Sequence, residues 1–465
     1  MSLALGLSFV LASAAVVTPP APNLRARSVP TWVRDGVVYE VFPRVFSPSG
    51  DLAGVTARLD DIQRLGATIL WIMPVQPIGR DRRKGTHGSP YSIQDYDRIN
   101  PDYGTEADFK KLVVEAHRRG LRVILDVVAN HTSWDSVLMS RPELYVRDAA
   151  GKVQPPSADW NDVAKLDYAN PELRRHMTAV LARWLRDFDL DGFRCDVAGL
   201  VPTDFWVAAR LELQKIKSDL FLLAEWSEPG LMVEAFDVDY AWPFHRTLNQ
   251  VLFGAAPASA LRATWEEERR TFPHGSLHLR FSDNHDERRA IARFGEQAGL
   301  AAAALILSLD GVPLIYNAME AGDTAESGGP ALAERIPILW ATAERRPEFL
   351  LFFTRMIALR RAHEALRQGE TQWLSNSDES RVLTFRRSDG LDAFVVAINL
   401  SSLPWTGTVG LPEPGQFVEV TPPLTAPLLP GESKPTVLTP PPAALPLLSL
   451  GPWGFRLFQR SGDGR

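Results

Sequence analysis

The chain has 465 residues, of which 45% are hydrophobic and 23% are charged, and its formal net charge is -6. This composition is typical of a globular protein with a large core and argues against disorder over most of the length. Acidic and basic residues are interspersed, so the sequence offers no basic surface for nucleic acid and no polybasic membrane patch.

The N-terminal stretch SLALGLSFVLASAAVVTPP is apolar and ends in small residues and prolines, as in a secretory signal. No Lys or Arg precedes it, so a cytoplasmic protein is the alternative. It is too short for a confident membrane span, and no later stretch resembles one. We expect residues 1–30 to be a signal peptide and linker, and the protein to be exported to the periplasm or the medium. The only cysteine, Cys195, excludes an internal disulfide.

Eight short apolar runs alternate with longer segments between residues 31 and 365. The runs are residues 37–42, 68–73, 121–128, 191–197, 220–226, 236–242, 277–284 and 312–317. Continuous apolar strands separated by amphipathic helices predict a parallel sheet that is covered on both faces. Eight such units favour an α/β fold of the (β/α)8 TIM-barrel type over an open sheet.

Two of the segments between the strands carry clear helix-start signals. Thr105 and Asp108 resemble a capping box, and Asn170 stands before Pro171 at the start of a second amphipathic stretch. Residues 131–169 break the rhythm after the third strand, and so long a connection is usually functional.

After residue 370 the pattern changes to short alternating runs between Gly and Pro turns. This pattern predicts an antiparallel β-domain, a β-sandwich, over residues 370–463.

Polar side chains gather at the ends of the predicted strands. In a TIM barrel, such residues at the C-terminal ends of strands are typical of an active site. They are Asp126, Asn130 and His131 after the third strand, Arg194 and Asp196 on the fourth, Glu225 at the end of the fifth, and Asn284, His285 and Asp286 at the end of the seventh.

The segment DGFRCDV, residues 191–197, puts Arg194 and Asp196 on one face of a strand and Cys195 on the other. We expect Cys195 to pack as a small hydrophobic residue. A neighbouring guanidinium lowers the pKa of a carboxyl, which suits a nucleophile at Asp196. Glu225 ends the apolar run LFLLAE, where burial raises the pKa and favours an acid. Glycoside hydrolysis needs this division of roles.

Each of these residues also has a purely structural interpretation. Arg194 and Asp196 fit a structural ion pair, and Glu225 fits an acid at a helix start. His131 and His285 fit hydrogen-bonded loop histidines. Acids at four separate strand ends are harder to explain as core, so the whole cluster favours chemistry.

The motifs at the strand ends resemble those of the α-amylase family of glycoside hydrolases, glycoside hydrolase family 13. The four ordered motifs are DVVANH (126–131), GFRCDV (192–197), LLAEW (222–226) and FSDNHD (281–286). The flanking signatures are GVVYEVFPRVF (36–46), LDYAN (166–170) and GVPLIYNAMEAG (311–322). The resemblance covers roughly residues 32 to 460, and it implies a catalytic barrel over residues 31–365, a domain B inserted at about 131–169 and a C-terminal β-domain.

The resemblance also implies a role for each residue of the site. Asp196 is expected to be the nucleophile of a retaining mechanism, Glu225 the general acid and base, and Asp286 the residue that stabilises the transition state. The residues expected to bind the sugar are Arg194, His131, His285 and Tyr91 of GSPYSIQDY, with Asp126 supporting Arg194.

The sequence departs from the family pattern after the nucleophile. Gly199 and Leu200 stand where many endo-acting members have Lys-His, which puts an aglycone contact and one calcium ligand in doubt. Asn130 matches a family calcium ligand, and it equally fits a hydrogen-bonding strut. A structural Ca2+ is therefore one alternative, and no cofactor is expected to be required for the chemistry.

We expect a retaining hydrolase that cleaves α-1,4-glucosidic bonds in starch-like α-glucans or maltooligosaccharides through a covalent glycosyl-aspartate intermediate. One alternative is a transglycosylase, or a sucrose- or trehalose-converting enzyme, of the same family. An alternative from another class is a non-catalytic carbohydrate-binding relative, against which the three acids together argue. The expected partner is an α-glucan or oligosaccharide, with no nucleic acid and no membrane span in the mature chain; the sequence leaves the oligomeric state open.

Overall fold

The computed structural model describes residues 24–390, 392–411, 416–423 and 445–461. Residues 1–23, which hold most of the expected signal peptide and linker, lie outside the described residues, so export stays a prediction. Among the helices of the described ranges, none is long and apolar enough to cross a membrane.

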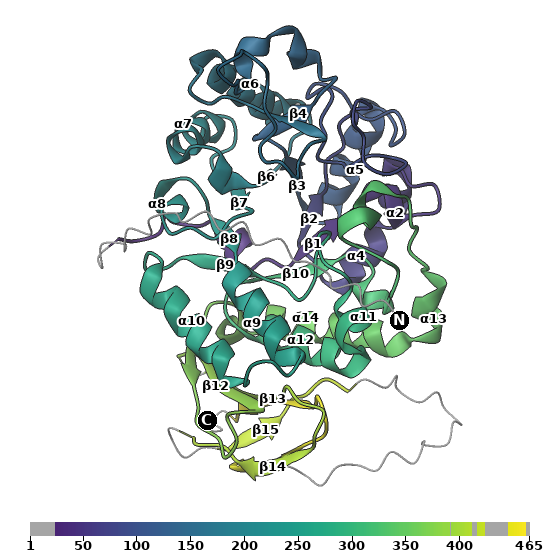
Figure 1. Cartoon of the computed structure of the whole chain (residues 1–465). Helices are drawn as coiled ribbons and strands as arrows, with labels where there is room; N and C mark the ends of the chain where they lie inside the picture. The colour runs from purple at the N-terminus through teal and green to yellow at the C-terminus, as the bar shows by residue number, and fades with distance from the viewer. Residues whose placement is uncertain (1–23, 391, 412–415, 424–444, 462–465) are drawn as a thin grey trace, which may run out of the picture.

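Eight parallel strands close into a barrel at the centre of the molecule (Figure 1), in the order β1-β10-β9-β8-β7-β6-β3-β2. Each strand lies within one of the eight predicted apolar runs, so the (β/α)8 prediction is confirmed. The strands are β1 (Val38–Val41), β2 (Ile69–Ile72), β3 (Arg122–Val127), β6 (Gly192–Cys195), β7 (Phe221–Ala224), β8 (Val238–Tyr240), β9 (Leu277–Arg280) and β10 (Val312–Tyr316).

The inside of the barrel is filled by one apolar cluster that includes Val38, Trp71, Leu223, Tyr240 and Leu279. The alternate residues of the strands belong to a second cluster, which packs against the surrounding helices. Burial on both faces explains why these strands appear in the sequence as continuous apolar runs.

Helices surround the barrel and follow the amphipathic segments of the sequence. The longer ones are α4 (Leu59–Leu65), α5 (Glu106–Arg118), α6 (Pro171–Asp187), α7 (Thr203–Gln214), α9 (Trp242–Leu252), α10 (Ser259–Thr271), α12 (Glu296–Ser308) and α14 (Pro347–Ala362). The shorter ones are α1 (Thr31–Arg34), α2 (Pro43–Phe46), α3 (Leu52–Ala57), α8 (Leu231–Glu234), α11 (Ala290–Phe294), α13 (Ala341–Arg345) and α15 (Glu364–Arg367). The predicted caps are present: Thr105 and Asp108 form a capping box on α5, and the Asn170 side chain accepts a hydrogen bond at the start of α6.

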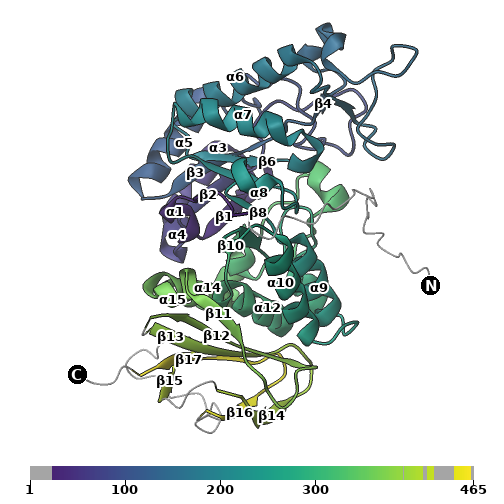
Figure 2. The ribbon, with the colours of Figure 1, turned by 90° about the vertical axis from the view of Figure 1, so that its left-hand side faces the viewer.

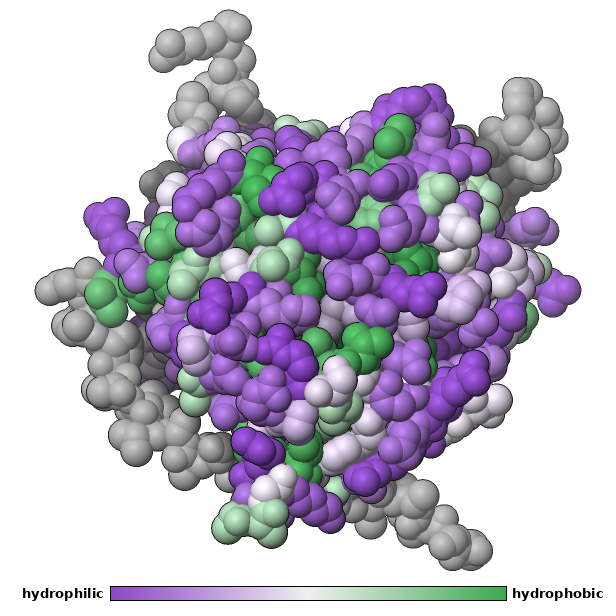
Figure 3. All heavy atoms as spheres, turned by 90° about the horizontal axis from the view of Figure 1, so that it is seen from above, coloured by the Kyte–Doolittle hydropathy of each residue, from purple (hydrophilic) through white to green (hydrophobic). Residues whose placement is uncertain are grey.

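The connection between β3 and α6 forms a small sheet of its own. In it, β4 (His131–Ser133) pairs antiparallel with β5 (Val163–Lys165). This inserted segment, residues 131–169, also holds the single-turn helices η1 (Val137–Ser140) and η2 (Pro142–Leu144). Figure 3 views this end of the molecule from above; hydrophilic side chains dominate it, and apolar ones form small separate groups, as expected for a solvated surface.

The C-terminal part forms the predicted antiparallel β-domain. Figure 2 shows it below α12, α14 and α15, on the side away from the inserted segment. A five-stranded sheet, β11-β12-β13-β17-β15, and the two-stranded sheet β14-β16 share an apolar core. The strands are β11 (Glu370–Trp373), β12 (Val382–Asp389), β13 (Asp392–Asn399), β14 (Trp405–Thr408), β15 (Phe417–Glu419), β16 (Leu447–Leu450) and β17 (Phe455–Arg460).

Gly192 lets β6 and β7 lie side by side, and we expect Gly192→Ala to destabilise the barrel. A Cβ atom at this position would lie 1.9 Å from the carbonyl oxygen of Phe221, which is backbone and cannot turn away. The two strands would have to separate, which typically costs about 1–3 kcal/mol for overpacking of a tight core. Thermal unfolding measures the effect. The control is Gly451→Ala, where a Cβ meets nothing within 4 Å; equal loss of stability in both variants would contradict this account.

Candidate active site

Asp196 and Glu225 extend side by side from neighbouring strands. The backbone N–H of Asp196 donates to the carbonyl of Val127 at 2.9 Å, and the N–H of Glu225 donates to the carbonyl of Cys195 at 3.0 Å. The ladders of β6 and β7 therefore continue one residue beyond the strands. This register brings two acids that lie 29 positions apart in the sequence to the same end of the barrel.

Cys195 packs away from these acids, as predicted. Its side chain is fully buried in the apolar cluster on the helix side of the barrel. Burial raises the pKa of the Cys195 thiol well above its usual range, which disfavours the thiolate form needed for nucleophilic chemistry.

Arg194 is the centre of the site and is fully buried. Its Nη1 donates to Asp126 Oδ1 at 2.9 Å and to Asp196 Oδ1 at 3.2 Å. Its Nη2 lies 2.9 Å from Glu225 Oε1, an ion pair without the alignment of a hydrogen bond. The guanidinium also lies 5.1–5.7 Å from the ring centres of Trp71, Tyr91 and Tyr240. One cation thus holds three carboxylates together.

The prediction that the pKa of Asp196 is depressed is wrong, although Arg194 does act in the predicted direction. Burial raises the pKa of Asp196 well above its ordinary value, the carboxylate of Glu225 raises it further, and Arg194 opposes both effects. The physical reason is that one guanidinium is shared among three buried carboxylates, so its charge cannot fully offset the cost of ionising all of them.

The pKa of Glu225 is raised mainly by burial, as the sequence predicts, and Arg194 opposes the shift. Both acids therefore have raised pKa values, which favours the protonated form of each.

Val197 turns the backbone toward Glu225 directly after Asp196. It adopts a left-handed conformation with φ of 37°, which is costly for a β-branched residue. Its N–H donates to Glu225 Oε2 at 2.8 Å. The strained turn thus fixes one oxygen of Glu225, while Arg194 holds the other.

Tyr91, His285 and Asp286 form a second group of contacting residues in the site. The Tyr91 hydroxyl lies 3.1 Å from Asp126 Oδ2 and 2.7 Å from His285 Nε2, and its ring stacks on His285 at 5.3 Å. His285 Nε2 also lies 3.3 Å from Asp286 Oδ2. The side chain of Asp286 is 40% exposed, whereas those of Asp196 and Glu225 are 8% and 11% exposed, so Asp286 faces the open side.

His131 begins β4 and lies at the edge of the same cluster. Its Nε2 is 3.9 Å from Asp196 Oδ2, its Nδ1 is 3.2 Å from the amide nitrogen of Asn130, and its ring meets Trp160 edge-on at 5.8 Å. Burial lowers the pKa of His131 to about 4, so it is neutral near pH 7. The described structure therefore brings together all of the predicted acids, Arg194, Tyr91 and both histidines.

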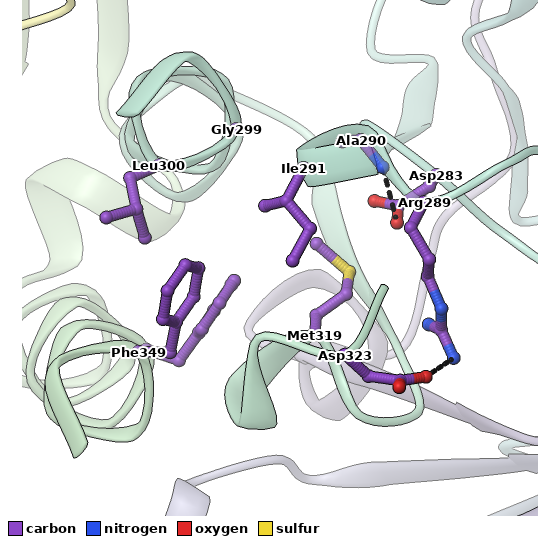
Figure 4. A pocket seen from close by; sticks show the side chains of 10 residues that line it. Asp283, Arg289, Ala290, Ile291, Gly299, Leu300, Met319, Asp323 and Phe349 are labelled. Carbon is purple, nitrogen blue, oxygen red and sulfur yellow. Dashed lines mark hydrogen bonds and ion pairs between the residues drawn. The ribbon is translucent and has the colours of Figure 1, made fainter. Parts of the chain in front are cut away.

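The loop that carries Asp286 is tied to the segment that follows β10. Ser327 Oγ donates to the carbonyl of Glu287 at 2.7 Å, and a Cβ at Gly328 would lie 2.3 Å from the carbonyl oxygen of Asp286. Figure 4 shows the small cavity behind this loop, where Arg289 pairs with Asp323 at 3.3 Å. The cavity measures about 20 Å³, room for a single water molecule. These contacts fix the position of Asp286.

The loop before Tyr91, residues 79–90, bridges two other segments that follow barrel strands. Lys84 Nζ lies 2.7 Å from Asp162 Oδ1 in the inserted segment. A few residues later, the N–H of Thr86 donates to Glu334 Oε1 at 2.9 Å, in the segment after β10. The loop thus joins the inserted segment to the segment after β10.

Glu40 and Tyr240 also belong to the site, although the strand-end motifs do not include them. Glu40 on β1 is fully buried and contacts His285 Nδ1 at 2.5 Å, and the Tyr240 hydroxyl on β8 accepts from Arg194 Nε at 3.3 Å. The signal for Glu40 was available: it lies two residues after Val38, so it points into the barrel from an otherwise apolar run.

Comparison with known proteins agrees with the geometry of the site. The family model described as "Alpha amylase, catalytic domain" matches residues 28–148 and 157–349, more than half of the chain. The chain belongs to the α-amylase family. This agrees with the resemblance of the strand-end motifs and makes the chain a member of a glycosidase family.

Relatives in this family differ in their names and lengths. Alpha-amylase MalA of Haloarcula japonica is 29% identical over 418 residues, which cover 83% of this chain and 58% of that protein. A cyclomaltodextrinase of a Bacillus species is 27% identical and is matched over 80% of this chain and 73% of its own length. The solved structure of the noncanonic maltogenic alpha-amylase AmyB from Thermotoga neapolitana has a TM-score of 0.79 at 26% identity, covering 92% of this chain and 96% of that chain.

The departure from the α-amylase family pattern at Gly199 has a structural counterpart. A Cβ at Gly199 would lie 2.1 Å from the indole nitrogen of Trp226, the residue after Glu225. The indole therefore packs directly on the glycine backbone, in space that a lysine side chain at this position would need.

The calcium prediction stays untested. Within the described residues there is no group of three or more His, Cys, Asp or Glu side chains that could hold a metal ion. The Asn130 amide nitrogen lies 3.2 Å from His131 Nδ1, which fits the interpretation of Asn130 as a hydrogen-bonding strut.

The neighbours Arg194 and Cys195 provide a matched test of which side chain serves the site. We expect Arg194→Lys to lower activity on α-glucans by about 100-fold or more, because a single ammonium cannot hold three carboxylates in place. Cys195→Ala should keep activity within about twofold and lose only packing, about 1 kcal/mol of stability. Steady-state rates and thermal unfolding of both variants check this. A large loss of activity in folded Cys195→Ala would contradict the assignment.

Proposed function

We propose that the protein is a retaining glycoside hydrolase that cleaves α-1,4-glucosidic bonds in starch-like α-glucans or maltooligosaccharides. The observation that carries the proposal is the shared contact of Asp196 and Glu225 with Arg194, which holds two carboxyl groups side by side at the open end of the barrel. Relatives named α-amylase, cyclomaltodextrinase and maltogenic amylase support an α-glucan substrate.

In the proposed reaction, Glu225 protonates the glycosidic oxygen while Asp196 attacks the anomeric carbon. The bond to the leaving sugar breaks, and a covalent glycosyl-Asp196 intermediate forms. Glu225 then takes a proton from water, which attacks the same carbon and releases Asp196. A retaining mechanism of this kind needs carboxyl groups about 5 to 5.5 Å apart.

The remaining residues of the site supply binding and charge. Arg194 and His285 place positive charge beside the acids, and Asp286, on the open side, is positioned to accept hydrogen bonds from the sugar hydroxyls. Such groups act most strongly when they are held in place before the reaction begins. Tyr91 offers a ring face and a hydroxyl to the same sugar.

We expect Asp196→Asn and Glu225→Gln to respond differently to the leaving group. Both should lower kcat on maltooligosaccharides, Glu225→Gln by about 10²–10⁴-fold, because general acid catalysis is lost. On α-maltosyl fluoride, whose fluoride leaves without a proton, Glu225→Gln should recover most of its kcat/KM, while Asp196→Asn should stay inactive. Fluoride release measures both rates.

The control for this pair is wild-type protein assayed on starch, pullulan, cyclodextrin, maltose, trehalose and sucrose, with product analysis. Release of maltooligosaccharides or maltose from the α-1,4-linked substrates supports the proposal. Exclusive conversion of sucrose or trehalose, or binding without cleavage by wild type and both variants alike, would overturn it.

A further inference from the structure

Glu40 is a buried acid on the inner face of the barrel, and it contacts a ring nitrogen of His285. Its side chain is fully buried, and its Oε1 lies 2.5 Å from Nδ1 of His285. Its second oxygen, Oε2, is buried without a hydrogen-bond partner. A buried carboxylate with one contact depends heavily on the charge of that contact.

The other ring nitrogen of His285 faces a second acid. Nε2 lies 3.3 Å from Asp286 Oδ2 and 2.7 Å from the hydroxyl of Tyr91. An ionised carboxylate only accepts hydrogen bonds, so a ring with a carboxylate on each side is satisfied when both nitrogens carry a proton. That form of histidine is the imidazolium cation.

We propose that Glu40 is a positioning residue that keeps His285 as the imidazolium cation, so that Nε2 presents a donor N–H to Asp286 and to the bound sugar. The inference rests on the proposed function for the role of the sugar, but the charge state of the ring can be measured without it. In this role Glu40 acts through His285 and does not itself contact the substrate.

The surroundings of His285 carry both signs of charge. The titratable or charged groups that face it are Glu40 of β1, Asp126 of β3, Arg194 of β6, Glu225 of β7, and Tyr91 and Asp286 of the loops. On the side of β10, the Tyr316 ring lies under Arg289, and both line a small cavity that His285 also lines. The acids outnumber the cations around the ring, which favours the charged form.

The pKa directions agree with this geometry. Burial alone would lower the pKa of His285, but Asp286 and Glu40 raise it to about 9. Burial raises the pKa of Glu40, and His285 opposes that shift, so each partner favours the ionised form of the other. Burial lowers the pKa of His131 to about 4, and its nearest carboxylate oxygen, Asp196 Oδ2, lies 3.9 Å away. We therefore expect one cationic and one neutral histidine in the site near pH 7.

The sign of the pH effect follows from the raised pKa. An ordinary histidine loses its charge as the pH rises through its pKa of about 6.5. A histidine whose pKa is raised in the folded protein stays charged until the pH reaches the raised pKa. The amide of a glutamine at position 40 cannot balance the imidazolium. The charge of His285 should then be lost at lower pH.

The test is the pH dependence of kcat/KM on α-maltosyl fluoride for wild type and Glu40→Gln. Fluoride departure needs no proton from Glu225, so the alkaline limb on this substrate does not report that acid. In wild type we expect the alkaline limb of the kcat/KM profile near pH 9. In Glu40→Gln we expect this alkaline limb about two pH units lower, with the acid limb of the profile unchanged. Coincident alkaline limbs in two folded proteins would overturn the inference.

The matched control is Glu320→Gln, a second buried acid that follows β10. Glu320 contacts the hydroxyl of Tyr39 at 2.5 Å and no histidine, so this variant should keep the wild-type limb. An equal shift in both variants would mean that loss of any buried acid moves the limb, and the proposal would fail.

A second measurement needs no activity. In wild-type protein with ¹⁵N-labelled histidine, both ring nitrogens of His285 should remain protonated from pH 6 to pH 8, with its signal identified by its loss in His285→Gln. A neutral ring at pH 7 would overturn the inference even if the enzyme cleaves every glucan. If the wild type cleaves no α-maltosyl fluoride, the proposed function fails, and the same charge measurement on wild type and Glu40→Gln still decides this inference.

Discussion

The contact of one buried guanidinium with three carboxylates is the constraint on which the rest of the site depends. Arg194 has no access to water, and Asp126, Asp196 and Glu225 come from three neighbouring strands. Removing one member would leave the others buried with unbalanced charge, which typically costs several kcal/mol. The barrel register that aligns β3, β6 and β7 is thus also the register that builds the acid pair.

Charge in this site is arranged so that no acid has a cation to itself. Arg194 is shared among three carboxylates, and His285 lies between Glu40 and Asp286. Burial raises the pKa values of Asp196 and Glu225, and a cation that they share only partly offsets the shift. A dedicated salt bridge for Asp196 would favour ionisation of that acid.

Much of the architecture could be predicted because burial leaves a direct trace in the sequence. The barrel strands are covered on both faces and appear as apolar runs, and polar residues at their ends mark the site. The pKa of Asp196 could not be predicted, because the sequence shows Arg194 two positions away but not that Asp126 and Glu225 share it. Glu40 shows a related limit: its inward position follows from strand alternation, but its partner His285 lies 245 residues further along the chain.

The proposed mechanism requires a covalent bond between Asp196 and the sugar, and trapping that bond provides a direct test. With 5-fluoro-α-glucosyl fluoride, the electronegative fluorine slows both chemical steps while the fluoride leaving group sustains the first, so the intermediate should accumulate. Digestion and mass spectrometry should then find one fluoroglucosyl group on the peptide that contains Asp196, attached to its carboxylate. A label on Glu225, or no label in a preparation that hydrolyses α-glucans, would contradict the account.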